Sequence, residues 1–200
     1  MISGITGLIG HVLEKPLDLI VRGLARLGIR PNVLTLTGLI LNLVAAGTLY
    51  LGQFRWAAAL ILVANLLDVF DGHLARRTGQ VSPFGAFLDS VVDRYADLIL
   101  MSALWLYYSR SHDHWMLFIV GLAIIGSVMT SYTRARAECI IPSCKVGLFE
   151  RSERIALLVL GALLNRMPQA LLIVALFANL TGIQRIVYTW WVLSTSEKTL

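Results

Sequence analysis

Long apolar segments recur along almost the whole of this 200-residue chain, and they constrain its fold more than any other feature. Hydrophobic residues make up 57% of the sequence, whereas charged residues make up only 14%. A helix needs about 20 consecutive, mainly apolar residues to cross the hydrocarbon core of a bilayer. The sequence therefore predicts an all-α, polytopic membrane protein built as one compact domain.

Six segments reach or approach this length, and short runs of turn-forming or polar residues separate them. We expect these segments to be six transmembrane helices, at residues 32–52, 55–76, 83–108, 114–137, 153–165 and 168–194. Together they form a predicted membrane domain over residues 31–195.

The first 30 residues have a different pattern. Apolar side chains such as Leu17 and Leu24 recur at intervals of three to four, while Lys15 and Arg22 lie on the opposite face. This pattern predicts an amphipathic helix that lies in the membrane interface before the first span. A soluble helix packed on a soluble core fits less well, because the remaining sequence offers no such core.

The positive charges are unevenly placed around the predicted spans. An even number of spans puts both termini on the same side of the membrane. With that side cytoplasmic, most lysines and arginines fall in or near the inner half, and Arg55, Arg110 and Arg166 fall opposite. The positive-inside rule then favours cytoplasmic termini and a cytoplasmic acidic segment. We expect a multi-pass protein of the cell (plasma) membrane whose active site faces the cytoplasm. Nucleic-acid binding is disfavoured, because the basic residues form no single patch that alternates with aromatics.

The two cysteines, Cys139 and Cys144, lie in one short connection. They could form a strained disulfide or share a metal ion. Because no further metal ligands of the usual spacing lie nearby, two ordinary thiols are the better interpretation.

Four aspartates interrupt the second and third predicted spans. Asp68 and Asp71 are three residues apart, and Asp89 and Asp93 are four apart, so each pair shares a helix face. A short connection joins the two helices, which makes them antiparallel neighbours whose acidic faces can converge. Ion transporters also use intramembrane carboxylates, but they more often distribute them over several broken helices.

Converging carboxylates would repel one another unless a cation lay between them. Ligation by oxygen alone selects a hard ion, and Mg²⁺ or Mn²⁺ suits phosphoryl chemistry better than Ca²⁺. Four carboxylates could hold two such ions about 3.5–4 Å apart.

Small residues accompany the acids. Gly72 and Ala75 share the face of the first acidic pair, and Gly85 lies one turn before the second. They could leave room for a ligand or allow close helix packing, and both roles stay open. Arg76 could extend to the interface or bind phosphate, and we favour phosphate.

The complete pattern is Asp68-x2-Asp71-Gly72-x2-Ala75-Arg76-x8-Gly85-x3-Asp89-x3-Asp93. It resembles the signature of the CDP-alcohol phosphatidyltransferase family at every fixed position. The resemblance implies a usually homodimeric membrane enzyme that joins a CDP-linked lipid to an alcohol and releases CMP. It also implies roles for individual residues: Asp68, Asp71, Asp89 and Asp93 as metal ligands, Asp93 also as the catalytic base, and Gly72, Ala75, Arg76 and Gly85 as CDP-binding residues. Asn32 and Thr35, in Pro31-Asn32-x2-Thr35, resemble a further nucleotide contact of the family.

A second set of polar residues lies later in the chain: Ser131, Arg134, Arg154 and Arg185. Arginines beside a serine hydroxyl suit a phosphate or sulfate group, because the planar guanidinium matches an oxyanion. The acceptor should then be a phosphorylated alcohol. Internal ion pairs with nearby glutamates are an equally good explanation for Arg136 and Arg151.

The surrounding elements, Ser-Tyr-x2-Ala-Arg-Ala-Glu from Ser131 and Gly-x2-Glu-Arg-x-Glu-Arg from Gly147, resemble those of prokaryotic phosphatidylinositol-phosphate and archaetidylinositol-phosphate synthases. That resemblance implies inositol phosphate as the acceptor, held by Ser131, Arg134, Arg154 and Arg185. Bacterial members often have lysine in place of Arg134. Glycerol 3-phosphate is the alternative acceptor, a cation or proton transporter is the alternative class, and the lipid tails stay open.

Overall fold

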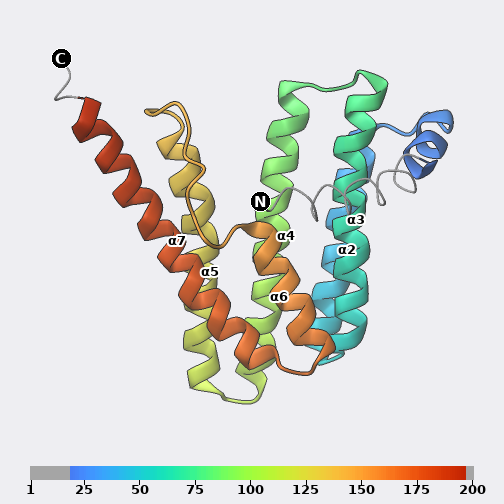
Figure 1. Ribbon diagram of the computed structural model, residues 1–200. Helices are drawn as coiled ribbons and strands as arrows, with labels where there is room; N and C mark the ends of the chain where they lie inside the picture. Colours follow the sequence, from blue (N-terminus) through green and yellow to red (C-terminus); the bar gives the residue numbers. More distant parts are fainter. Residues whose placement is uncertain (1–18, 197–200) are drawn as a thin grey trace, which may run out of the picture. The chain divides into compact units, whose positions relative to one another are not determined.

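The computed structural model describes residues 19–196, and all regular structure in that range is helical (Figure 1). Residues 19–26 are helical, and six helices follow: α2 (Pro31–Tyr50), α3 (Phe54–Thr78), α4 (Pro83–Arg110), α5 (His114–Ala137), α6 (Arg151–Leu163) and α7 (Met167–Ser196). Each of the six coincides with a predicted span to within a few residues. The predicted amphipathic helix falls mostly on residues 1–18, which lie outside the described residues.

Four of these helices, α2, α3, α5 and α7, are long and apolar enough to cross a membrane. Helix α6 has 13 residues, and α4 carries several acids. Each helix from α2 to α7 exposes large apolar side chains, for example Ile40, Leu62, Leu106, Phe118, Leu160 and Leu176. Apolar outer surfaces suit contact with lipid tails, because no polar group there loses its water. These are the helices of a multi-pass membrane protein.

Proline and glycine mark several helix ends. Pro31 and Pro83 are the first residues of α2 and α4, where the fixed φ of proline favours a helix start. Gly52 and Gly79, just beyond the ends of α2 and α3, have φ values of 76° and 65°. Such left-handed backbone costs glycine little, so both positions favour a sharp turn. Asp113 caps α5 by accepting a hydrogen bond of 3.0 Å from the Met116 amide.

The described residues divide into two compact units, one formed by residues 19–41 and 63–93 and the other by residues 42–62 and 94–196. The first unit contains the four aspartates of the signature. Its buried apolar core includes Val21, Leu34 and Leu74. The second unit contains the later arginines and has a larger apolar core, to which α5, α6 and α7 contribute.

Within the second unit, α7 packs closely along α5. A Cβ atom on Gly126 would lie 2.7 Å from Asn179 Nδ2 and 2.9 Å from Ala178 Cβ, so this contact requires glycine. Thr130 Oγ1 lies 2.7 Å from the Gly126 carbonyl of its own helix and 3.0 Å from the Ala178 carbonyl of α7, so its proton is shared between the two. Asn179 Nδ2 donates a hydrogen bond of 2.9 Å to the Leu122 carbonyl. Small residues and interhelical hydrogen bonds are the usual means of joining helices in membranes.

Candidate active site

Three of the four signature aspartates gather between α3 and α4. Asp68 and Asp71 lie one turn apart on α3, and Asp89 lies on α4. Each contributes a carboxylate oxygen, and these oxygens lie within 4.8 Å of one another. Asp71 is buried, with 6% of its surface exposed, and the other two are partly buried. The acidic faces of the two helices therefore converge, as their spacing predicts, while Asp93 lies outside this group of three.

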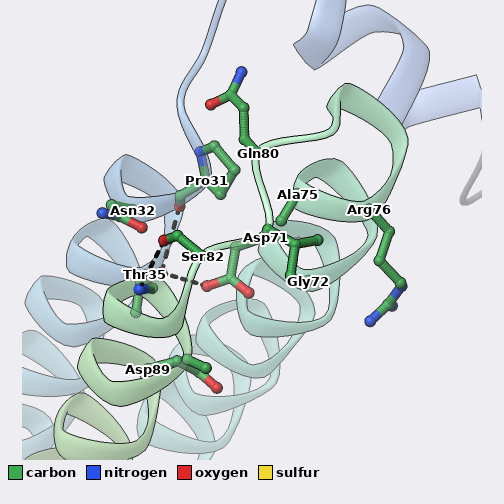
Figure 2. Close-up of a pocket in the computed structure, with 13 residues that line it drawn as sticks. Pro31, Asn32, Thr35, Asp71, Gly72, Ala75, Arg76, Gln80, Ser82 and Asp89 are labelled. Atoms are coloured by element: carbon green, nitrogen blue, oxygen red, sulfur yellow. Dashed lines mark hydrogen bonds between the residues drawn. The ribbon is translucent and has the colours of Figure 1, made fainter.

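Helix α2 adds Thr35 to the acidic group. Thr35 Oγ1 lies 2.5 Å from Asp71 Oδ2 and 3.3 Å from the Pro31 carbonyl (Figure 2). A hydroxyl has one proton to donate, and bonds to an ionised carboxylate are shorter and stronger than bonds to a carbonyl. The short distance therefore indicates that Thr35 donates to Asp71. This bond orients the most buried carboxylate of the group.

The three aspartates suit a divalent metal ion. Their oxygens are near enough to share one cation, and a hard ion such as Mg²⁺ or Mn²⁺ prefers oxygen ligands. Burying like charges together without a cation would be costly. The donor set and its burial thus fit the predicted metal, and Asp93, one turn after Asp89, could complete it.

A cavity of about 310 Å³ opens beside the acids. Its lining contains the predicted CDP-binding residues Asn32, Thr35, Gly72, Ala75, Arg76 and Gly85, together with Asp71 and Asp89. In Figure 2, Asn32 and Thr35 come from α2, Asp71, Gly72, Ala75 and Arg76 from α3, and Asp89 from α4. One cavity therefore brings together the predicted nucleotide-binding residues and two of the predicted metal ligands.

Gly72 and Gly85 lie close to neighbouring side chains, and both line the cavity. A Cβ atom on Gly85 would lie 3.1 Å from Ser82 Oγ and 3.7 Å from Asn32 Oδ1, which shows a close approach to neighbouring groups. A Cβ atom on Gly72 would lie 3.6 Å from the Arg76 guanidinium. Both glycines also line the cavity, so their small size keeps it open.

Sequence reasoning missed several residues of the cavity wall. Gln80, Val81 and Ser82 line it from the connection between α3 and α4, and Ala86 lines it from α4. Ser82 also caps α4, since its Oγ accepts a hydrogen bond of 3.0 Å from the Gly85 amide. The eight-residue spacer within the signature was the available signal, because a short connection between two halves of a site must border that site.

In the second unit, Arg154 and Arg151 share the carboxylate of Asp97. Arg154 Nη2 lies 2.8 Å from Asp97 Oδ2, and Arg151 Nε lies 3.4 Å from Asp97 Oδ1. Arg154 is 2% exposed. Its Nε and Nη1 atoms have no hydrogen-bond partner within residues 19–196. Arg151 therefore forms an internal ion pair with an aspartate.

Arg185, on α7, is bound by protein oxygens on three sides. Its Nε donates to the Val146 carbonyl at 2.8 Å, its Nη1 to the Thr130 carbonyl at 2.5 Å, and its Nη2 to Glu150 Oε1 at 3.1 Å. Arg134 and Arg154 lie near enough to affect it electrostatically. The structure thus brings these predicted arginines together, but it also gives Arg185 internal partners.

Arg134 and Arg185 share a second carboxylate. Arg134 Nη1 lies 3.6 Å from Glu150 Oε1, and Arg134 Nε donates to Glu138 Oε1 at 3.1 Å. That hydrogen bond holds the pKa of the Glu138 carboxyl below its ordinary value. Ser131 lies one turn before Arg134 on α5 and is partly buried.

Cys139 and Cys144 are both free thiols, as predicted.

Known proteins similar to this chain belong to the family that the acidic signature predicts. Residues 28–196 match the CDP-alcohol phosphatidyltransferase family. Archaetidylinositol phosphate synthase of Pyrococcus horikoshii is 38% identical over 175 residues, which cover 87% of this chain and 90% of that protein. Phosphatidylinositol phosphate synthase of Streptomyces avermitilis is 35% identical over 82% of this chain and 73% of its own length.

Solved structures have the same fold. The crystal structure of Mycobacterium tuberculosis phosphatidylinositol phosphate synthase with CDP-DAG bound aligns with a TM-score of 0.81 and 26% identity, covering 87% of this chain and 93% of that one. The same enzyme in complex with manganese and citrate aligns with a TM-score of 0.79 and 27% identity. The chain belongs to the CDP-alcohol phosphatidyltransferase family, which confirms the prediction from the signature.

Proposed function

We propose that this protein transfers a phosphatidyl-type group from a CDP-linked lipid to inositol phosphate and releases CMP. The donor is CDP-diacylglycerol or CDP-archaeol. The observation that carries the proposal is the cavity in which Asp71 and Asp89 meet the glycines and Arg76 of the family signature. The names of the relatives, which are inositol phosphate lipid synthases, support the acceptor.

In this proposal Asp68, Asp71, Asp89 and Asp93 hold Mg²⁺ or Mn²⁺, as two ions. When bound, these ions neutralise the diphosphate and stabilise the charge on departing CMP. The relative crystallised with manganese supports the choice of metal. Thr35 keeps the carboxylate of Asp71 oriented through its hydrogen bond.

The residues around the cavity bind the nucleotide and so position the lipid-linked phosphate for attack by the acceptor hydroxyl, with CMP as the leaving group. Gly72 and Gly85 admit the CDP group, and Arg76 neutralises phosphate charge. Asn32 supplies a polar contact at the cavity wall. Asp93 takes the proton from the attacking hydroxyl of the acceptor, which requires only that its carboxylate be within hydrogen-bond reach of that hydroxyl.

The arginine cluster selects a phosphorylated acceptor. We assign Ser131, Arg134, Arg154 and Arg185 to the phosphate of inositol phosphate. Two donors of Arg154 have no hydrogen-bond partner among residues 19–196, and they support this role, because a buried guanidinium favours an anion that completes its hydrogen bonds. Glu150 gives up its contacts with Arg134 and Arg185 when the phosphate binds.

We further propose that all six helices from α2 to α7 span the plasma membrane, after an amphipathic N-terminal helix. The basic residues then place both termini and the active site on the cytoplasmic side. In this arrangement the acids of α4 face protein rather than lipid. The enzyme works as a homodimer, which rests on resemblance to its family.

An acceptor comparison tests the proposal. The purified protein, in detergent with CDP-diacylglycerol and Mn²⁺, is offered inositol phosphate, glycerol 3-phosphate or free inositol, and the lipid product is identified by mass spectrometry. We expect product with inositol phosphate and much less with the other two. Turnover with glycerol 3-phosphate alone would contradict the acceptor, and turnover with free inositol would contradict the role of the arginines.

A further inference from the structure

Asp97 is a buried acid that belongs to neither the metal ligands nor the nucleotide-binding set. It is 8% exposed and lies on α4 among the buried residues Ala96, Leu100 and Met101. An ionised carboxylate in such surroundings must be paired, because an isolated buried charge is very costly. Its partners therefore indicate what it does.

Both oxygens of Asp97 are engaged by arginines at the start of α6. Oδ2 accepts from Arg154 Nη2 at 2.8 Å, and Oδ1 accepts from Arg151 Nε at 3.4 Å. Two contacts through different oxygens fix the plane of the carboxylate. Because Asp97 and its partners lie on regular helices, this arrangement holds the Arg154 guanidinium in one orientation.

Arg154 contacts Asp97 through Nη2 alone. Its Nε and Nη1 are buried and have no hydrogen-bond partner in the part of the chain that the structure describes. Buried donors are rarely left in this state, and a missing ligand is one explanation. The pair with Asp97 thus leaves two donors available for an anion.

We propose that Asp97 is a positioning residue, which holds Arg154 so that its remaining donors bind the phosphate of the acceptor. The inference rests on the proposed function, because it deepens the description of the same acceptor site. Asp97 itself does not contact the substrate. Its effect is on acceptor binding through Arg154, as an outer partner orients a metal ligand.

Glu150, which contacts both Arg134 and Arg185, differs from Asp97 in its exposure to solvent. The Glu150 side chain is 46% exposed, whereas that of Asp97 is 9% exposed. Exposed ion pairs contribute little, because water and salt screen them. Asp97 is therefore the carboxylate whose loss should change the position of an arginine.

The substitution Asp97→Asn tests the proposal, since it retains size and removes the charge. The apparent KM values for inositol phosphate and for CDP-diacylglycerol are measured in membranes. A KM value does not depend on the amount of folded enzyme, so a lower yield of the variant does not change it. We expect the KM for inositol phosphate to rise about tenfold or more, with the KM for CDP-diacylglycerol and kcat at saturating acceptor within about twofold. Asp113→Asn, at the cap of α5, is the matched control and should leave both KM values unchanged.

An equal change in both KM values, or a loss of stability with an unchanged acceptor KM, would overturn the positioning role. If Asp97→Asn leaves too little enzyme to assay, Asp97→Glu replaces it, because the charge is retained while the carboxylate is displaced by one methylene group. The acceptor KM should again rise selectively, and a wild-type value would count against the proposal. Absence of turnover by the wild-type protein with inositol phosphate would instead refute the proposed function.

Discussion

The Thr35 hydroxyl, on α2, donates a hydrogen bond of 2.5 Å to Asp71 Oδ2 on α3. Both residues are buried, and both line the cavity that holds the predicted nucleotide-binding residues. The bond joins Thr35, which the family resemblance gives as a nucleotide contact, to the predicted metal ligand Asp71. Thr35 is therefore expected to act on metal binding as well as on the nucleotide.

Thr35→Val should weaken metal binding, because it removes the donor that orients Asp71. Loss of an outer-shell partner typically costs about 10–100-fold in metal affinity or activity. We expect the Mn²⁺ concentration for half-maximal CMP release to rise by at least about tenfold. Thr37→Val is the control, because Thr37 Oγ1 donates to the Val33 carbonyl and is exposed. Equal metal requirements in the two variants would contradict this role.

Asp93→Asn should abolish turnover and leave CDP-lipid binding measurable. Asparagine cannot accept the proton of the attacking hydroxyl. Asp93 does not line the nucleotide cavity, so the substitution leaves the cavity lining unchanged. CMP release and binding of a labelled CDP-lipid are measured on the same preparation. Retention of more than a few per cent of activity would remove Asp93 as the base.

Arg154→Lys should raise the KM for inositol phosphate while the protein still folds. Lysine keeps the positive charge beside Asp97, but it lacks the planar set of donors that binds an oxyanion. Arg166→Lys, at an exposed position between α6 and α7, provides the control. A lower yield with an unchanged acceptor KM would show that Arg154 serves only in the ion pair.

Gly147→Ala should destabilise the protein through the connection before α6. A Cβ atom there would lie 2.6 Å from Thr181 Cγ2, and the φ of +137° is unfavourable for alanine. Overpacking of this kind costs about 1–3 kcal/mol. Gly79→Ala is the control, because Gly79 also has a positive φ but no atom within 4 Å of its would-be Cβ. The melting temperature in detergent should fall further for Gly147→Ala, and an equal fall would contradict the close contact.

Much of the fold followed from local features of the sequence. Apolar runs and turn residues predicted the positions of α2 to α7, because helices of a membrane protein must satisfy their backbone internally. The convergence of Asp68, Asp71 and Asp89 was also predictable, since helical spacing and one short connection determine it. Gly72, Ala75 and Gly85 line a cavity beside these acids, while their role in CDP binding stays a prediction.

The partners of the arginines were less predictable. Asp97 is more than 50 residues from Arg154, and no spacing rule links them. Glu150 precedes α6 and contacts arginines of α5 and α7, which depends on how the connection folds back. Contacts of this kind depend on tertiary packing. The sequence could identify the charged residues, but it could not say which carboxylate each arginine would meet.

The most direct test of the central claim is metal-dependent release of CMP by the purified protein. CDP-diacylglycerol and inositol phosphate are supplied, bound metal is removed with a chelator, and Mn²⁺ or Mg²⁺ is returned. We predict that CMP release stops on chelation, returns with either ion, and is absent in Asp71→Asn at the same ion concentration. CMP release that persists without metal would contradict a metal site at these carboxylates, and no CMP under any condition would contradict the transfer reaction itself.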